Sequence, residues 1–510
     1  HGRASVTHRA RTVSAPEELA IAQHDRGPAR AAGPRLGRRA VTGVCLVLVV
    51  QLAASLEFPA AALAHGIVGR ADLPVPVWLF GWAAAVVLVI SFVALSVLWT
   101  RPQLQSPQNT RLLHIPVIFA RIANVAGLLV FAVVIYSGLA GAQVPAVNFS
   151  VTFVYVVFWV GLPIASVLLG DIFRELSPWR SCARTIRWVA RRARSNFAAR
   201  TMHLPEALGQ WPAVAVLLGF AWLELVYVGR EVPSTLAALS LGYFAAMVAG
   251  MLAFGVEEWS ERTDGFSAYF TTVARMSPLC GDGRGSLCVR RPLSGLSQMP
   301  ILPGTVALVC ALIGTTTFDG FENDALWRKL EPGLQTAFSM FSLPSASAQE
   351  LAYTAGLALS VGLVFFVYHA GIRGVATVSR RYSRHELSRR FAHTLVPIGF
   401  AYVLAHYFSL LIWQGQAIGY LASDPLGNGA NLFGTAGETI DYAIVSYAAI
   451  WYVQVAALVA GHLGGLTLAH DRALAIYPNG RTAVRSQYWM MTVMVAFTSF
   501  GLWLLSAVGT

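Results

Sequence analysis

The chain has 510 residues, of which 56% are hydrophobic and only 12% charged, and its formal net charge is +12. The charged residues are concentrated between apolar runs of about twenty residues, which excludes a soluble globular protein. This pattern predicts an all-α fold, a polytopic membrane helix bundle with the lipid bilayer as its partner. The arginines lie in alternate loops, as membrane topology requires, so the positive charge does not indicate a nucleic-acid partner.

The N-terminal part of the chain is not predicted to belong to the helix bundle. Residues 1–37 are rich in Arg, Ala, His, Gly and Pro without an apolar period, which is typical of a disordered tail or a misassigned start. Residues 38–64 are basic, then apolar, and end in Ala-Leu-Ala, which is a signal-peptide pattern; the alternative is an uncleaved first helix. Cleavage would leave a mature bundle over 65–510 that begins with the free amine of His65.

Apolar segments suited to membrane helices follow in chain order. They cover about 77–99, 121–142, 151–172, 211–229, 235–256, 303–318, 350–374, 393–413, 439–468 and 487–507. The positive-inside rule then places the arginine-rich loops in the cytoplasm and both mature termini outside, as in a multi-pass protein of the cell membrane. Two of the loops are predicted to contain a helix. The spacing of residues in 173–210 predicts an amphipathic helix on the inner leaflet, and the outer loop 319–349 is expected to contain a short helix around Asp324 to Phe341.

The segment 391–416 carries His406 at a depth where imidazoles are rare. On a helix it shares a polar face with Tyr402 and Ser409, and this face must meet protein or water. His393 lies on another face, which disfavours a bis-histidine haem. No nucleotide-binding loop, HExxH, HxH or GxSxG motif is present, so any catalysis would use a site built between helices.

The predicted topology places further ionisable residues on the outer side. Glu224 falls in the outer half of its helix, Asp319 caps GTTTFDGF at the outer surface, and Asp441 opens its helix. With His65 and His406 they could converge on one outward-facing site, in which the two histidines bind copper or zinc and the three carboxylates are catalytic. The alternative is that His65 merely begins an ordered segment and Asp441 caps a helix.

A second set of polar residues lies near the cytoplasmic ends of the helices, where a structural role is favoured: His369, His393, His462 and Asp171. His462 sits within Gly461 to Gly465, a GxxxG pattern that lets another helix approach closely. The stripe of Tyr447, Trp451, Gln454 and Leu458 on the same helix is suited to pair with the His406 face. His385 and His470 are expected to be solvated.

Several runs resemble a family of actinobacterial polytopic membrane proteins labelled fenitrothion hydrolase. They are AHGIVGRADLPVPVWLFGWAAAVVLVISFVALSVLW, GDIFRELSPWR, FAWLELVYVG, GTTTFDGF and HTLVPIGFAYVLAHYFSLLIWQGQ, and the likeness runs from about Ala64 to the C-terminus. The resemblance implies hydrolysis of an organophosphate triester at its aryl ester bond. It brings no catalytic motif, and the extension before Arg35 departs from the family pattern.

Two functions therefore compete. The first is a membrane-embedded hydrolase of small lipophilic triesters that uses a metal-activated water at the outer site. The second is an ion- or proton-coupled transporter or a copper-handling membrane protein, in which the same residues bind or relay an ion. A structural subunit of a larger membrane complex is a third and less favoured reading.

Overall fold

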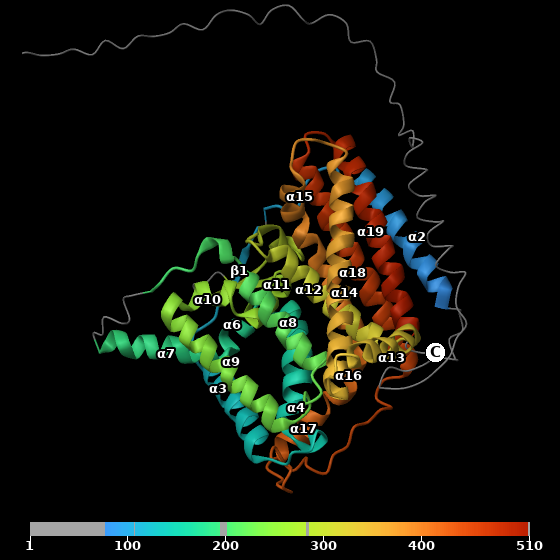
Figure 1. Cartoon of the computed structure of the whole chain (residues 1–510). Coiled ribbons are helices and arrows are strands. Elements are labelled where there is room, and N and C mark those ends of the chain that lie inside the picture. The colour runs from blue at the N-terminus through green and yellow to red at the C-terminus, as the bar shows by residue number, and fades with distance from the viewer. Residues whose placement is uncertain (1–76, 107, 194–200, 282–284, 508–510) are drawn as a thin grey trace, which may run out of the picture.

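The computed structural model describes residues 77–106, 108–193, 201–281 and 285–507. Its helices are α2 (Val77–Leu98), α3 (Val117–Ala140), η1 (Pro145–Val147), α4 (Phe149–Thr152), η2 (Phe153–Gly161), α5 (Leu162–Leu169), α6 (Phe173–Leu176), α7 (Pro178–Arg192), η4 (Glu206–Leu208), α8 (Trp211–Leu225), α9 (Pro233–Phe254), α10 (Val256–Arg262), α11 (Gly265–Ala274), η5 (Ser294–Gln298), α12 (Thr305–Glu322), α13 (Ala325–Ser339), α14 (Ser345–Ala376), α15 (Arg384–Phe391), η6 (Ala392–Leu395), α16 (Val396–Gln414), α17 (Ala417–Ser423), α18 (Tyr447–Ile476) and α19 (Gly480–Ala507). Figure 1 shows α18 and α19 beside α2, and a second group in which α3, α7 and α10 pack against α9.

Nine of the described helical segments are long and apolar enough to cross a membrane. They coincide with the first nine predicted segments, and α19 covers the tenth, although it is not among the nine. The predicted polytopic helix bundle is therefore confirmed. The tail at 1–37 and the signal-peptide pattern at 38–64 lie outside the described residues.

A small antiparallel sheet, which the sequence did not predict, joins two distant loops. Its strands are β1 (Thr110–His114), β2 (Leu279–Gly281) and β3 (Ser286–Val289), in the order β1-β3-β2. Strands this short carry little alternation, which explains why they were missed. Because β1 and β3 come from 100–120 and 257–302, these two loops lie on the same side of the bundle, as the topology required.

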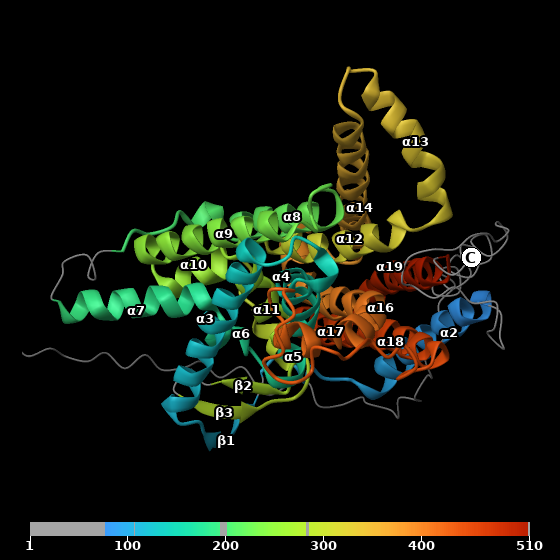
Figure 2. The ribbon, with the colours of Figure 1, turned by 90° about the horizontal axis from the view of Figure 1, so that it is seen from below.

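The outer loops also meet one another. The N–H of Ala142 donates to the carbonyl of Leu426 at 2.8 Å, which ties the loop after α3 to the loop after α17. The helix predicted in the outer loop 319–349 is α13, and the carboxylate of Asp324 caps its N-terminus by accepting from the N–H of Leu326 at 2.7 Å. Figure 2 shows α13 standing out from the bundle beside α14.

The close helix approach predicted from the GxxxG pattern is found between α16 and α18. A Cβ atom at Gly461 would lie 2.2 Å from the Cβ of Ala401, and one at Gly465 would lie 2.8 Å from the carbonyl oxygen of Thr394. Only glycine allows the two backbones to come this close. The contact fixes α16, and with it His406, against the centre of the bundle.

The prediction that His470 is solvated was wrong. His470 is buried; its Nε2 contacts the carbonyl of Trp99 at 2.9 Å and its Nδ1 contacts Gln487 at 3.0 Å. The neighbouring Asp471 is also fully buried and accepts from the indole N–H of Trp99 at 3.0 Å and from the amide of Gln105 at 2.6 Å. These hydrogen bonds attach the segment after α2 to helix α18. No local sequence pattern predicts this contact.

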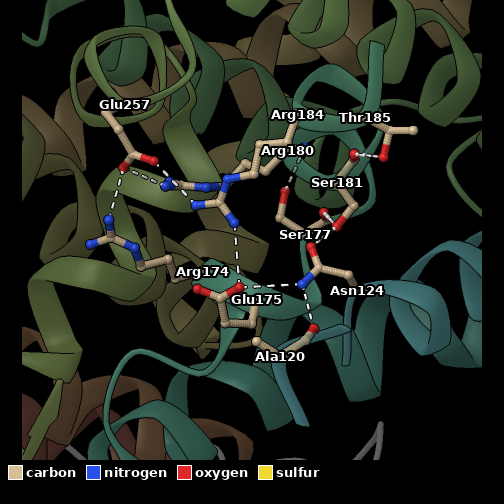
Figure 3. Close-up of polar contacts among 10 residues, drawn as sticks. All are labelled: Ala120, Asn124, Arg174, Glu175, Ser177, Arg180, Ser181, Arg184, Thr185 and Glu257. Carbon is tan, nitrogen blue, oxygen red and sulfur yellow. Dashed lines mark hydrogen bonds and ion pairs between the residues drawn. The ribbon is translucent and has the colours of Figure 1, made fainter. Parts of the chain in front are cut away.

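Helix α7 is the amphipathic helix predicted within 173–210, but its first half is packed into the protein rather than lying on a membrane surface. The guanidinium of Arg180, whose side chain is 5% exposed, bonds to Glu257 at 2.6 Å. Arg174 and Arg184 each reach the same carboxylate at 3.1 Å, as Figure 3 shows. Only the second half keeps the expected exposed apolar face, with Trp188 61% exposed.

Replacing Glu257 by Gln is expected to lower the free energy of unfolding by about 1–2 kcal/mol. Removing one partner of a buried pair costs more than this, but Glu257 is 52% exposed, so solvent screening reduces the effect. Burial alone would raise the pKa of Glu257, yet Arg180 and Arg174 hold that pKa below its usual value. The stabilisation is therefore present at neutral pH and is lost as the pH falls through the lowered pKa.

Thermal or chemical unfolding in detergent at several pH values measures this difference. The matched control is Glu386→Gln. Glu386 forms an ion pair with Arg390 on the same helix, and both side chains are exposed, Glu386 by 43% and Arg390 by 38%. We expect that control to change the free energy of unfolding by less than about 0.5 kcal/mol. Equal effects of the two substitutions would contradict the assigned role of Glu257.

Candidate functional site

The centre of the candidate site is a pair of polar side chains that meet between two membrane helices. Nε2 of His406, on α16, lies 2.9 Å from Oδ2 of Asp319, on α12. The side chains keep 12% and 13% exposure, so the pair is enclosed without being sealed. No described residue forms a hydrogen bond to Nδ1 of His406.

Helix α12 carries its carboxylate into the protein because it is surrounded by other helices. In its span, 78% of the residues are buried, the largest share among the nine spans. Gly314 allows close contact with α14: a Cβ there would lie 2.5 Å from the Cα of Val361, and Ser360 donates to the Gly314 carbonyl at 2.8 Å. The prediction that Asp319 caps a helix at the outer surface was therefore wrong, because it lies buried one turn before the helix ends.

Three further charged side chains gather around this pair. Glu224, from α8, interacts electrostatically with Asp319, and so does Glu322, one turn after Asp319 on α12. Arg230, in the turn after α8, interacts with all three carboxylates and donates to the carbonyl of Leu225 at 3.1 Å. The site thus brings together three acidic and two basic side chains.

Aromatic side chains with polar atoms enclose the cluster. The hydroxyl of Tyr407 interacts with the carboxylate of Asp319, and Tyr155 donates to the carbonyl of Arg230 at 2.8 Å. The indole of Trp159 lies beside Glu224 and Tyr407, yet its Nε1 makes no hydrogen bond of normal geometry to a described residue. Tyr155 and Trp159 both come from η2, a π-helical segment, and such segments are frequent at functional sites.

A polar pocket of about 270 Å³ lies against this cluster. Its lining includes Arg230 and Glu322 from the cluster, together with Glu231, Gln349 and Tyr353. One oxygen of Glu322, Oε2, is buried without a hydrogen-bond partner in the described part of the chain. The pocket therefore gives a polar molecule access to Arg230 and Glu322 of the cluster.

The structure brings together three of the five residues predicted for the site: Glu224, Asp319 and His406. His65 lies outside the described residues, so its part in a metal site stays a prediction. Asp441 does not open a helix, because α18 begins at Tyr447 after the cap residue Ser446.

Asp441 instead lies exposed in the outer loop, where it bonds to the N–H of Ala443 at 2.8 Å. Its backbone N–H donates to Gln416 at 3.1 Å. Gln416 follows His406 by ten residues, which is about 15 Å along a helix axis. Asp441 is therefore separate from the cluster.

A metal centre needs three or more suitable ligands, and among the described residues no group of three His, Cys, Asp or Glu side chains is arranged to hold one. The predicted copper or zinc site would need a ligand from outside these residues. Among the described residues, His406 and Asp319 form a pair in which a carboxylate orients an imidazole, and such a pair is able to transfer a proton.

The inner histidines stay apart from this cluster. His462 is fully buried, and its Nδ1 lies 2.8 Å from the Leu458 carbonyl. His393 is buried near Arg472 at the other end of α16. In each of them Nε2 is buried without a hydrogen-bond partner among the described residues, so the structural role stays a prediction.

The sequence reasoning missed Glu322, Arg230, Tyr407 and Trp159. Glu322 had a readable signal, because it follows Asp319 by three residues and shares its helix face. The other three depend on tertiary packing.

In comparisons with known proteins, the chain matches no protein-family model, no curated protein and no solved structure.

Proposed function

We propose that this protein is a membrane-embedded hydrolase of uncharged, lipophilic esters, of the organophosphate triester class. The observation that carries the proposal is the pair of His406 and Asp319. A histidine oriented by a carboxylate, with its second ring nitrogen open, is the arrangement of a general base. The proposed reaction agrees with the resemblance described from the sequence, and a protein of the cell membrane would meet such substrates dissolved in the bilayer.

In the proposed reaction, the Nε2–H group of His406 donates a hydrogen bond to the carboxylate of Asp319, and Nδ1 keeps its lone pair. Nδ1 takes a proton from water while the water oxygen forms a bond to phosphorus. The bond from phosphorus to the aryl oxygen breaks, and the aryl oxide then receives the proton from His406. The products are a phosphodiester acid and an aryl alcohol, so one water is consumed and no oxidant is required.

The surrounding groups fit supporting roles in this chemistry. Arg230, which lies at the polar pocket, supplies positive charge for the phosphoryl oxygen as negative charge develops there. The hydroxyl of Tyr407 helps to hold the Asp319 carboxylate. A metal-activated water, with His65 and His406 as ligands to copper or zinc, remains the alternative source of the nucleophile.

Proton- or ion-coupled transport is the second candidate function, and the carboxylate cluster favours it. Glu224, Asp319 and Glu322 lie close enough to interact with one another, and such a group of carboxylates can hold a proton or a cation. Ionisable groups at this depth in a membrane are commonly proton or ion sites. In that case the same residues would move a proton rather than activate water.

One experiment on liposomes containing the purified protein separates the two functions. Release of 4-nitrophenol from diethyl 4-nitrophenyl phosphate measures hydrolysis, and a trapped pH-sensitive dye measures proton movement. The hydrolase predicts product release well above that of protein-free liposomes, without a substrate-dependent pH change across the membrane beyond the acid formed. Substrate-driven proton flux without product release would overturn the hydrolase and support transport.

A further inference from the structure

A large apolar cavity lies between α3, η2, α8 and α9, apart from the charged cluster. Its volume is about 580 Å³, within the usual range for sites that bind small organic molecules. Aromatic side chains form much of its wall, namely Phe131, Phe153, Phe158, Phe220, Phe266, Trp179, Trp222 and Tyr243. None of the sequence motifs accounts for it.

The polar atoms of the three aromatic residues Trp179, Tyr243 and Trp222 in this wall are already bonded within the protein. The indole of Trp179 and the hydroxyl of Tyr243 donate to the two oxygens of Asp264, at 2.6 Å and 2.7 Å. The indole of Trp222 donates to Thr354 at 2.9 Å. The cavity therefore offers almost no hydrogen bonds and no charge, so an occupant has to be uncharged and apolar.

The cavity has access from the side of the bundle that faces lipid. Leu239 on α9 and Val130 on α3 line the cavity and are 48% and 37% exposed, and only 28% of the α9 span and 6% of the α3 span are buried inside the protein. A molecule dissolved in the hydrocarbon region can therefore reach the cavity without crossing water.

One aromatic pair separates the cavity from the charged cluster. Phe220 lines the cavity, and its ring centroid lies 4.7 Å from that of Trp159. Trp159 lies beside Glu224 on the other side. The rings of Phe220 and Trp159 therefore separate the apolar cavity from Glu224.

We infer that this cavity binds an uncharged aromatic molecule that enters from the bilayer. Aromatic rings pack well against an aromatic wall, in offset or edge-to-face arrangements, and an aryl ester supplies such a ring. The inference rests on the proposed function only in naming this molecule as the substrate on its way to His406. Binding itself does not require hydrolysis.

Gly219 offers a direct way to fill the cavity. It lines the cavity, and a Cβ atom placed there meets nothing within 4 Å, so the side chain of Gly219→Phe begins in open space. The matched control is Gly242→Phe on α9, because Gly242 also has open space around its Cβ position but does not line the cavity.

The test uses an uncharged dialkyl phosphate triester with a benzophenone aryl group, which is photo-crosslinked to the protein in liposomes. We expect crosslinks on α3, η2, α8 and α9, competed by triphenyl phosphate, and at least a tenfold loss of labelling in Gly219→Phe but none in Gly242→Phe. His406→Ala should label normally, which separates failure of the cavity from failure of the hydrolase.

Three outcomes would overturn the inference. The first is equal labelling of the two phenylalanine variants, and the second is crosslinking to helices that do not line the cavity. The third is that labelling in detergent solution is lost on addition of diacyl phospholipid but not of triphenyl phosphate, since this would assign the cavity to a lipid chain.

Discussion

Replacing His406 by Ala is expected to reduce triester hydrolysis by about a hundredfold or more, because general-base catalysis contributes roughly this factor. The substitution removes the nitrogen that accepts the proton and leaves Asp319 without the partner that lies 2.9 Å away. Initial rates of nitrophenol release from purified protein measure the effect. Asp319→Asn should give a similar loss, because an amide can present its N–H to the ring and reverse the tautomer.

The matched control is His369→Ala. His369 also lies in a membrane helix, but its Nδ1 contacts the carbonyl of Phe365 at 2.8 Å and its Nε2 contacts Ser388 at 3.3 Å, away from the cluster. This variant should keep nearly full activity. If His406→Ala and His369→Ala were equally active, the assignment of His406 as the base would be wrong.

Replacing Gly461 by Ala is expected to destabilise the protein by about 1–3 kcal/mol. The added Cβ would lie 2.2 Å from the Cβ of Ala401 and 2.7 Å from the carbonyl of Pro397, so α16 and α18 must separate. Because α16 carries His406, hydrolysis should fall as well. Thermal unfolding in detergent measures the loss of stability.

Gly464, on the same helix, provides the control. Its Cβ would lie 3.3 Å from a side-chain atom of Pro397, a contact that a small shift relieves. Gly464→Ala should therefore leave stability within about 1 kcal/mol, and the better helix propensity of alanine acts in its favour. Equal unfolding temperatures for the two variants would contradict the close packing of α16 on α18.

Much of the fold was accessible from the sequence because membrane helices carry a strong signal. Long apolar runs and alternating arginine loops are enough to place the described spans. The same reasoning selected Glu224, Asp319 and His406, which the structure brings together, although it placed Asp319 at the outer surface instead of within α12. Depth restricts where residues can meet, and only a few ionisable groups lie at this level.

The remaining parts of the site depend on packing that no local pattern encodes. Arg230 reaches the carboxylates from a turn, and Trp159 faces them from a π-helical segment. Asp441 was misplaced because the start of α18 was read from hydropathy alone. Ser446, whose hydroxyl accepts from the N–H of Ala449 at 3.2 Å, is the cap that marks the true start.

Hydrolysis in water enriched in oxygen-18, by purified wild-type protein, tests the central claim most directly. Attack of water on phosphorus predicts one heavy oxygen in the phosphodiester product and none in the aryl alcohol, at a rate well above that without protein. Heavy oxygen in the aryl alcohol, or no turnover by correctly folded protein, would contradict the proposed reaction at His406 and Asp319.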